Sequence, residues 1–149
     1  MRHHLVVLHA HYLELLLDGS KRIECRLSKV MRPPFRAVTA GDLLWLKLPS
    51  HPVQAVAMAG ECLFRELGTG PDLEALIDEH GALIGAANGF FENAVDWARF
   101  CSLIWIETVV AIQPMTVYKS DQRAWVVLDE MPWPGMRVGS GKRHAIVRP

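Results

Sequence analysis

The feature that most constrains the fold of this chain is the repeated interruption of short apolar or alternating segments by proline and glycine. Segments of strand length cover residues 4–9, 21–27, 43–48, 53–64, 103–112, 116–118 and 125–128. Runs of this length bounded by turn residues are typical of β-strands. The chain therefore predicts five to seven short, mostly antiparallel strands in a small barrel-like sheet.

Three segments between these strands predict short helices. Residues 11–19 (HYLELLLDG) carry leucines at helical spacing and end in a glycine, which is a common stop signal. Further helices are predicted at 72–80 and 92–100. Gly60 interrupts the long predicted strand and indicates a bend or bulge there. The fold class that follows is α+β, a barrel-like sheet with short flanking helices.

With 149 residues, the chain is long enough for one domain with its own core. We predict that this domain spans residues 1–130. Residues 131–149 (MPWPGMRVGSGKRHAIVRP) are rich in proline, glycine and basic residues, which predicts an irregular, partly ordered tail. The formal net charge is zero, so any contact with a polyanion requires a local basic patch.

The spacing of the cysteines and histidines and the length of the apolar stretches exclude several classes of protein. Three widely spaced cysteines form no disulfide framework, which favours a reduced, cytoplasmic protein. No apolar stretch has the length of a membrane span, so no membrane partner is expected. Four histidines lie close together near the start but lack metal-ligand spacing, and we expect neither a metal nor another cofactor.

Residues 19–26 (GSKRIECR) concentrate opposite charges on one predicted strand. Since alternate residues of a strand face opposite sides, Arg22, Glu24 and Arg26 are predicted to share one face, with Lys21 on the other face near the turn. A guanidinium held by a carboxylate can bind a phosphate or stack on a base. The alternative is an ordinary solvated strand face, since surface ion pairs contribute little.

The pattern GxKxxExR in this segment resembles the signature of the ASCH family, which belongs to the PUA-like superfamily. Similar matches follow in order at Gly41-Asp42, at residues 87–91 (ANGFF) and at residues 122–128 (QRAWVVL), so that the resemblance spans residues 4–128. It implies a PUA-like β-pseudobarrel. It also implies a cleft beside the first helix that accepts nucleic acid or a nucleobase-like ligand.

Together, the charged pattern and the resemblance predict a binding site for RNA, for single-stranded nucleic acid or for a nucleotide-like small molecule. Six residues are the candidates: Lys21, Arg22, Glu24, Arg26, Tyr12 and His11. Tyr12 is the predicted stacking residue, because single strands are often held by aromatic rings. A neutral His9 or His11, at the junction of the first strand and helix, is a predicted hydrogen-bond donor to the ligand. Basic residues in the loop at 29–36 and in the tail would extend the electrostatic surface.

Two other functions remain open. Some ASCH-like proteins resemble amidohydrolases that act on a modified cytidine with a lysine, a threonine and a glutamate. The corresponding positions here carry Lys21, Glu24 and Asn88, so that triad cannot be transferred. An enzyme, either a ribonuclease or a hydrolase of a modified nucleoside, is the alternative prediction. A protein-interaction surface at residues 132–136 (PWPGM) is the third.

Overall fold

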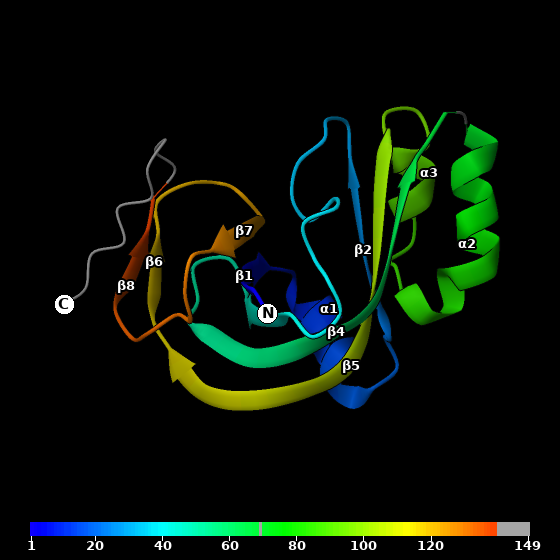
Figure 1. The fold of residues 1–149 in the computed structure, drawn as a ribbon. Helices are drawn as coiled ribbons and strands as arrows, with labels where there is room; N and C mark the ends of the chain where they lie inside the picture. The colour runs from blue at the N-terminus through cyan, green and yellow to red at the C-terminus, as the bar shows by residue number, and fades with distance from the viewer. Residues whose placement is uncertain (69, 140–149) are drawn as a thin grey trace.

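The computed structural model describes residues 1–68 and 70–139, which form a strongly curved sheet with helices inside and beside it (Figure 1). Within these residues the elements, in chain order, are β1 (His3–Val7), α1 (Ala10–Asp18), β2 (Ile23–Ser28), β3 (Leu43–Lys47), β4 (Val53–Glu66), α2 (Gly70–Ile84), α3 (Phe90–Ala94), β5 (Phe100–Met115), β6 (Val117–Lys119), β7 (Trp125–Leu128) and β8 (Met136–Val138).

Six of these strands form one sheet in the order β2-β5-β4-β3-β1-β7, and β6 pairs separately with β8. Within the six-stranded sheet only β1 and β3 are parallel; the other neighbours are antiparallel. The predicted α+β class, with a mostly antiparallel, barrel-like sheet, is confirmed.

The curvature is concentrated in the two long strands, β4 and β5, which bend through the base of the molecule (Figure 1). The register between them shifts from Ala59↔Ile106 to Cys62↔Ile104, so the chain bulges around Gly60. A Cβ atom at Gly60 would lie 2.8 Å from the Glu107 side chain. The bulge therefore suits glycine, as the sequence predicted, and it lets the sheet curl.

Curling brings the two edge strands, β2 and β7, toward each other. The Arg26 guanidinium on β2 lies 5.3 Å from the centre of the Trp125 ring on β7. It also donates a hydrogen bond of 3.0 Å to the carbonyl of Val7 at the end of β1. A cavity of about 420 Å³ separates the two strands elsewhere. We call this gap between β2 and β7 the seam of the half-barrel.

Helix α1 fills the inside of the curve. Its Leu13 and Leu16 are buried among side chains of β1, β3, β4 and β5. Gly19 ends the helix in the left-handed conformation (φ 84°) and its N–H bonds to the Leu16 carbonyl. The chain can therefore turn directly into β2, which places the charged segment next to α1. Helices α2 and α3 pack against β2 and β5 in a second apolar cluster.

Two predicted elements differ from the structure. The helix predicted at 92–100 is shorter, since α3 ends at Ala94 and Phe100 already pairs with Ser28 and Glu66 as the first residue of β5. Pairing with two neighbouring strands outweighs local helical spacing. Pro114 was expected to separate two strands but lies inside β5, beside a register shift in β4 that requires no N–H from it.

Part of the predicted tail belongs to the packed structure. β8 pairs with β6, and its Met136 and Val138 are buried with residues of β1, β4 and β7. These residues were predicted to be irregular, and a parallel partner strand orders them. The division of the chain at residue 130 stays a prediction, and residues 140–149 lie outside the described part.

No helix in residues 1–68 and 70–139 has the length and apolar character needed to cross a membrane.

Candidate ligand-binding cleft

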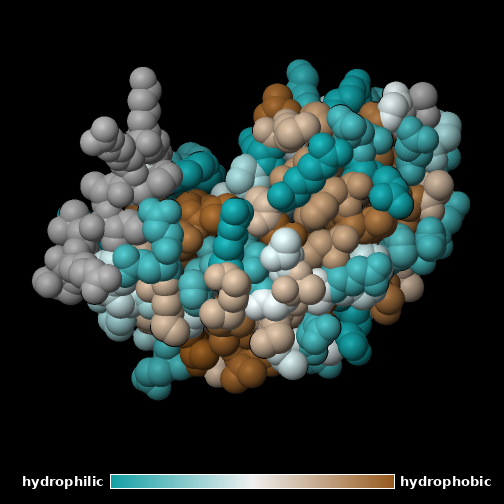
Figure 2. All heavy atoms as spheres, in the orientation of Figure 1, coloured by the Kyte–Doolittle hydropathy of each residue, from teal (hydrophilic) through white to brown (hydrophobic). Residues whose placement is uncertain are grey.

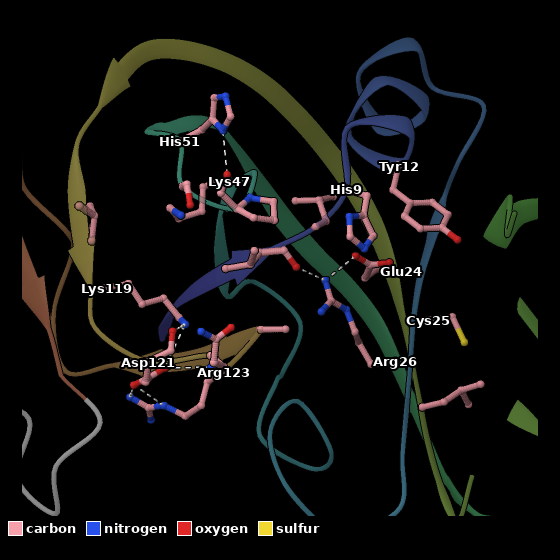
Figure 3. A pocket seen from close by; sticks show the side chains of 18 of the residues that line it. His9, Tyr12, Glu24, Cys25, Arg26, Lys47, His51, Lys119, Asp121 and Arg123 are labelled. Carbon is pink, nitrogen blue, oxygen red and sulfur yellow. Dashed lines mark hydrogen bonds and ion pairs between the residues drawn. The ribbon is translucent and has the colours of Figure 1, made fainter. Parts of the chain in front are cut away.

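A cavity of about 880 Å³ lies on the concave side of the sheet (Figure 3). One wall is formed by α1 and β2, and the other by residues 116–124 together with Lys47 and residues 49–52. Small-molecule sites typically measure roughly 300–1,000 Å³. The second, smaller cavity at the seam shares Arg26, Leu27 and residues 122–124 with it. In Figure 2 the surface is hollowed between the loop after β2 and the segment before β7. The two cavities together form one site, which we call the cleft.

The charged motif forms the first wall of the cleft as a network around Glu24. Its Oε1 lies 3.4 Å from the Lys21 ammonium and its Oε2 lies 3.1 Å from the Arg26 guanidinium. Lys21 is 2% exposed and also donates to the carbonyls of Ile23 and Ile84. Its three ammonium protons therefore all have partners, and Lys21 fixes Glu24 in place.

Burial by itself would raise the pKa of Glu24. The charges of Arg26 and Lys21, and the hydrogen bonds from both, oppose burial and hold the pKa below its usual value. Glu24 is therefore an anion at neutral pH. The Arg26 side chain is 20% exposed, against 1% for Lys21 and 8% for Glu24, so Arg26 is the group of this network that a ligand can reach.

A buried chain of hydrogen bonds supports Arg26 from below. Trp125, whose ring lies under the guanidinium, donates its indole N–H to His4 Nδ1 at 3.0 Å. His4 Nε2 lies 2.9 Å from the carboxylate of Asp42, which also accepts from the backbone N–H groups of Arg2 and Thr39. Since Nδ1 accepts the hydrogen bond from Trp125, it carries no proton, and His4 is neutral with its proton on Nε2. Burial lowers its pKa, more than Asp42 raises it.

The second wall carries four charged residues that sequence reasoning did not select. Asp121 pairs with the Lys119 ammonium at 3.0 Å and with the Arg123 guanidinium at 2.8 Å (Figure 3). Hydrogen bonds from Arg123 lower the pKa of Asp121 well below its usual range. Lys47, at the end of β3, is 5% exposed and donates to the Leu48 carbonyl at 3.0 Å.

The cleft is positive although the chain is neutral. Five cations line the larger cavity, namely Lys21, Arg26, Lys47, Lys119 and Arg123, against two carboxylates, Glu24 and Asp121. Their sum is a charge of +3 within the cavity, whereas the whole chain has a formal charge of zero. A concave surface with an excess of one sign attracts ligands of the opposite sign.

Aromatic rings lie on the side of the cleft where the motif lies. Tyr12, Phe90 and Trp97 all contribute to the lining of the larger cavity. The Tyr12 ring lies 5.1 Å from the Lys21 ammonium, and its hydroxyl accepts from the N–H of Ala87. Trp97 is 42% exposed. Trp97 falls within the helix predicted at 92–100, but it lies in the turn that follows α3.

The structure brings four of the six predicted site residues to this cleft. Lys21, Glu24, Arg26 and Tyr12 line the larger cavity. Arg22 and His11 are exposed and line neither cavity. The predicted alternation places Lys21 away from Glu24, but β2 begins only at Ile23, so Lys21 precedes the strand and its long side chain turns back toward Glu24. Of the two histidines predicted as hydrogen-bond donors, His9 contributes to the lining and His11 does not.

A curled mixed sheet closed by an arginine across its edge strands, with a central helix and a charged cleft at the seam, defines a PUA-like pseudobarrel. The solved structures with a similar fold include ASCH proteins. An ASCH protein from Zymomonas mobilis matches with a TM-score of 0.59 and 13% identity, over 75% of this chain and 71% of that chain. Two single-residue variants of that protein match with TM-scores of 0.61 (13% identity, 77% and 76% covered) and 0.65 (11% identity, 86% and 89% covered). The chain therefore has the ASCH fold, as the resemblance predicted.

At the level of sequence, no protein-family model and no curated protein matches this chain. Since the identity to the Zymomonas mobilis structures is 13% or less, their likeness concerns the fold alone.

Proposed function

We propose that this protein binds single-stranded nucleic acid, RNA in the first place, or a nucleotide, in the cleft at the seam. The observation that carries the proposal is the excess of three positive charges inside one cavity of an otherwise neutral chain. Phosphate groups supply most of the affinity of proteins for nucleic acids, and they require cations of this kind.

The neighbouring rings support a single-stranded ligand. RNA-binding proteins commonly stack unpaired bases on aromatic side chains or arginine planes. Tyr12, Trp97 and Arg26 offer such surfaces within the same cavity. A cavity of about 880 Å³ fits a nucleotide with its base turned outward from the strand. We assign base contact to the wall with Arg26, whose guanidinium plane can stack on a base while Glu24 holds it in place.

An enzymatic function, as a ribonuclease or a hydrolase of a modified nucleoside, stays the alternative prediction. Asn88, at the position of the family's glutamate, is exposed and lines neither cavity. The Lys21 ammonium is held by two carbonyls and Glu24. These placements do not favour acyl transfer. Incubation of the protein with labelled RNA, or with an acylated nucleoside, distinguishes the two functions: the binding proposal predicts that both are recovered intact.

The proposal is tested by fluorescence anisotropy with a labelled single-stranded RNA of mixed sequence. We expect Arg26→Ala to weaken binding about tenfold or more, because one charge-assisted contact contributes about 1.5–3 kcal/mol. Arg65→Ala is the matched control, since Arg65 is exposed on β4 and lines neither cavity. Equal affinity of the two variants would show that RNA binds elsewhere, and absence of binding by the unaltered protein would refute the function.

A further inference from the structure

The two walls of the cleft differ in composition, and this difference carries information about the ligand. The wall formed by the motif holds the aromatic rings and the Lys21–Glu24–Arg26 network, with a net charge of +1. The opposite wall holds Lys47, Lys119 and Arg123 with a single carboxylate, Asp121, which leaves +2. One wall is therefore suited to a planar base and the other to an anion.

Lys47 is the least compensated cation of the second wall. It is 5% exposed, and among the described residues no carboxylate forms an ion pair with it; its ammonium donates to one backbone carbonyl. Lys47 and Lys119 line the same cavity. Burial lowers the pKa of Lys47, and the positive charge of Lys119 lowers it further. A buried cation next to another cation is unfavourable unless an anion joins them.

The other two cations of this wall, Lys119 and Arg123, are already fixed in place by Asp121. Asp121 binds Lys119 through one oxygen and Arg123 through the other, so one carboxylate fixes two cations on this wall (Figure 3). Lys119 also donates to the backbone carbonyl of Asp121, and its side chain is 8% exposed. Groups that are already fixed lose little conformational entropy when a ligand arrives.

We propose that Lys47 and Lys119, with Arg123 beside them, form a phosphate-binding subsite of the cleft. This inference rests on the proposed function and makes it more specific: the ligand is a nucleoside phosphate, with its phosphate on the Lys47 wall and its base on the Glu24 wall. A nucleoside without phosphate fills only half of the site. The phosphate belongs either to a free mononucleotide or to the backbone of an RNA strand, since both present the same oxygens.

Lys47→Met removes the cation while keeping a side chain of similar length, and Lys29→Met is the matched control. The sequence predicted that the basic loop containing Lys29 would extend the electrostatic surface, but Lys29 is exposed and lines neither cavity, so it lies outside the proposed subsite. Isothermal titration compares the four common ribonucleosides with their 5′- and 3′-monophosphates. We expect at least one monophosphate to bind tenfold or more tightly than its nucleoside to the unaltered protein and to Lys29→Met. In Lys47→Met that advantage should fall to threefold or less.

Inorganic phosphate and pyrophosphate test the subsite without any base. At ionic strength matched with chloride, both anions should raise the Tm of the unaltered protein and of Lys29→Met, and raise that of Lys47→Met by less than half as much. Without ligand, Lys47→Met should have a higher Tm than the unaltered protein, a change that a merely structural lysine would not produce. Lys119→Met provides a second variant in which the anion effect should also be reduced.

The outcomes separate this inference from the proposed function. Equal binding of nucleosides and monophosphates, together with RNA binding that depends on Arg26, would overturn the phosphate subsite and leave the proposed function intact. Equal protection of Lys47→Met and Lys29→Met by phosphate would overturn the subsite as well. If monophosphates bind more tightly than nucleosides and single-stranded RNA does not displace them, the subsite is supported and the ligand is a free nucleotide. If single-stranded RNA displaces the monophosphates, the subsite is supported and the ligand is the RNA strand.

Discussion

Individual residues explain why the cleft keeps its shape. Glu24 lies between Lys21 and Arg26 with both oxygens occupied, and Arg26 rests on Trp125, which His4 and Asp42 hold. Each of these polar groups is buried or half-buried and each has a partner, which is the condition under which a buried network fixes a single arrangement. Asp42, from the Gly41-Asp42 match in the sequence, lines neither cavity and supports Arg26 only through His4 and Trp125.

Removal of the central carboxylate charge should destabilise the protein. Glu24→Gln leaves the buried Lys21 ammonium without its counter-ion, and breaking such a pair typically costs about 3–5 kcal/mol in free energy of unfolding. The double variant Lys21→Met/Glu24→Gln should recover part of this loss, because no unpaired buried charge remains. Urea unfolding measures both. A double variant less stable than Glu24→Gln alone would contradict the account of Lys21.

The neutral His4 predicts a pH dependence of stability. Since burial lowers its pKa in the folded state from the ordinary value of 6.5, the unfolded chain takes up this proton first as the pH falls. The contribution of neutral His4 to the free energy of unfolding is therefore fully present above about pH 6.5 and decreases as the pH falls below that value. His4→Gln should be less stable at pH 7 but should lose less stability between about pH 6.5 and pH 5. Denaturation data with the same pH slope for both proteins would show that folding does not change the pKa of His4, which contradicts this account.

At the scale of elements, short-range signals were sufficient for most of the sheet. The strand at Trp125–Leu128, the stop of α1 at Gly19 and the bulge at Gly60 follow from residues that act within a few positions of themselves. The second wall of the cleft could not be predicted, because Lys47 lies on β3 and Lys119 and Arg123 lie in residues 116–124. These two segments are distant in sequence and meet only when the sheet curls. One local signal was available: Lys47 is a lone lysine in the apolar strand LLWLK.

β8 tests whether residues after 130 belong to the domain. Met136 is fully buried against residues of β1 and β7, so Met136→Ala should cost about 2–5 kcal/mol of unfolding free energy. Met131, five positions earlier, is 55% exposed, and Met131→Ala should change stability by about 0.5 kcal/mol or less. Chemical denaturation of the two variants decides the question. Similar small effects would mean that β8 contributes nothing to the fold.

At the scale of the whole molecule, the proposed function depends on the difference in charge between the cleft and the rest of the chain. A formal charge of zero means that no general attraction draws polyanions to the protein, so their binding must follow the local charge of +3. This also limits the number of phosphates that the site can neutralise at once to about three.

Salt dependence measures that number. For a single strand the slope of log affinity against log salt concentration is about −0.7 for each phosphate neutralised, so we expect a slope of about −2 with single-stranded RNA. Lys119→Met should make the slope shallower by about 0.7 units. A slope steeper than about −4 would require a much larger basic surface than the cleft provides, and would place binding outside it.

The most direct test of the central claim, that the ligand occupies the cleft at the seam, is a titration of the ¹⁵N-labelled protein with single-stranded RNA, followed through its five indole N–H signals by NMR. Trp97 lines the larger cavity and Trp125 lies beneath Arg26 at the smaller one, whereas Trp45, Trp105 and Trp133 line neither. We predict that the signals of Trp97 and Trp125 shift in proportion to bound RNA while the other three stay in place. Shifts confined to Trp45, Trp105 or Trp133 would contradict the account.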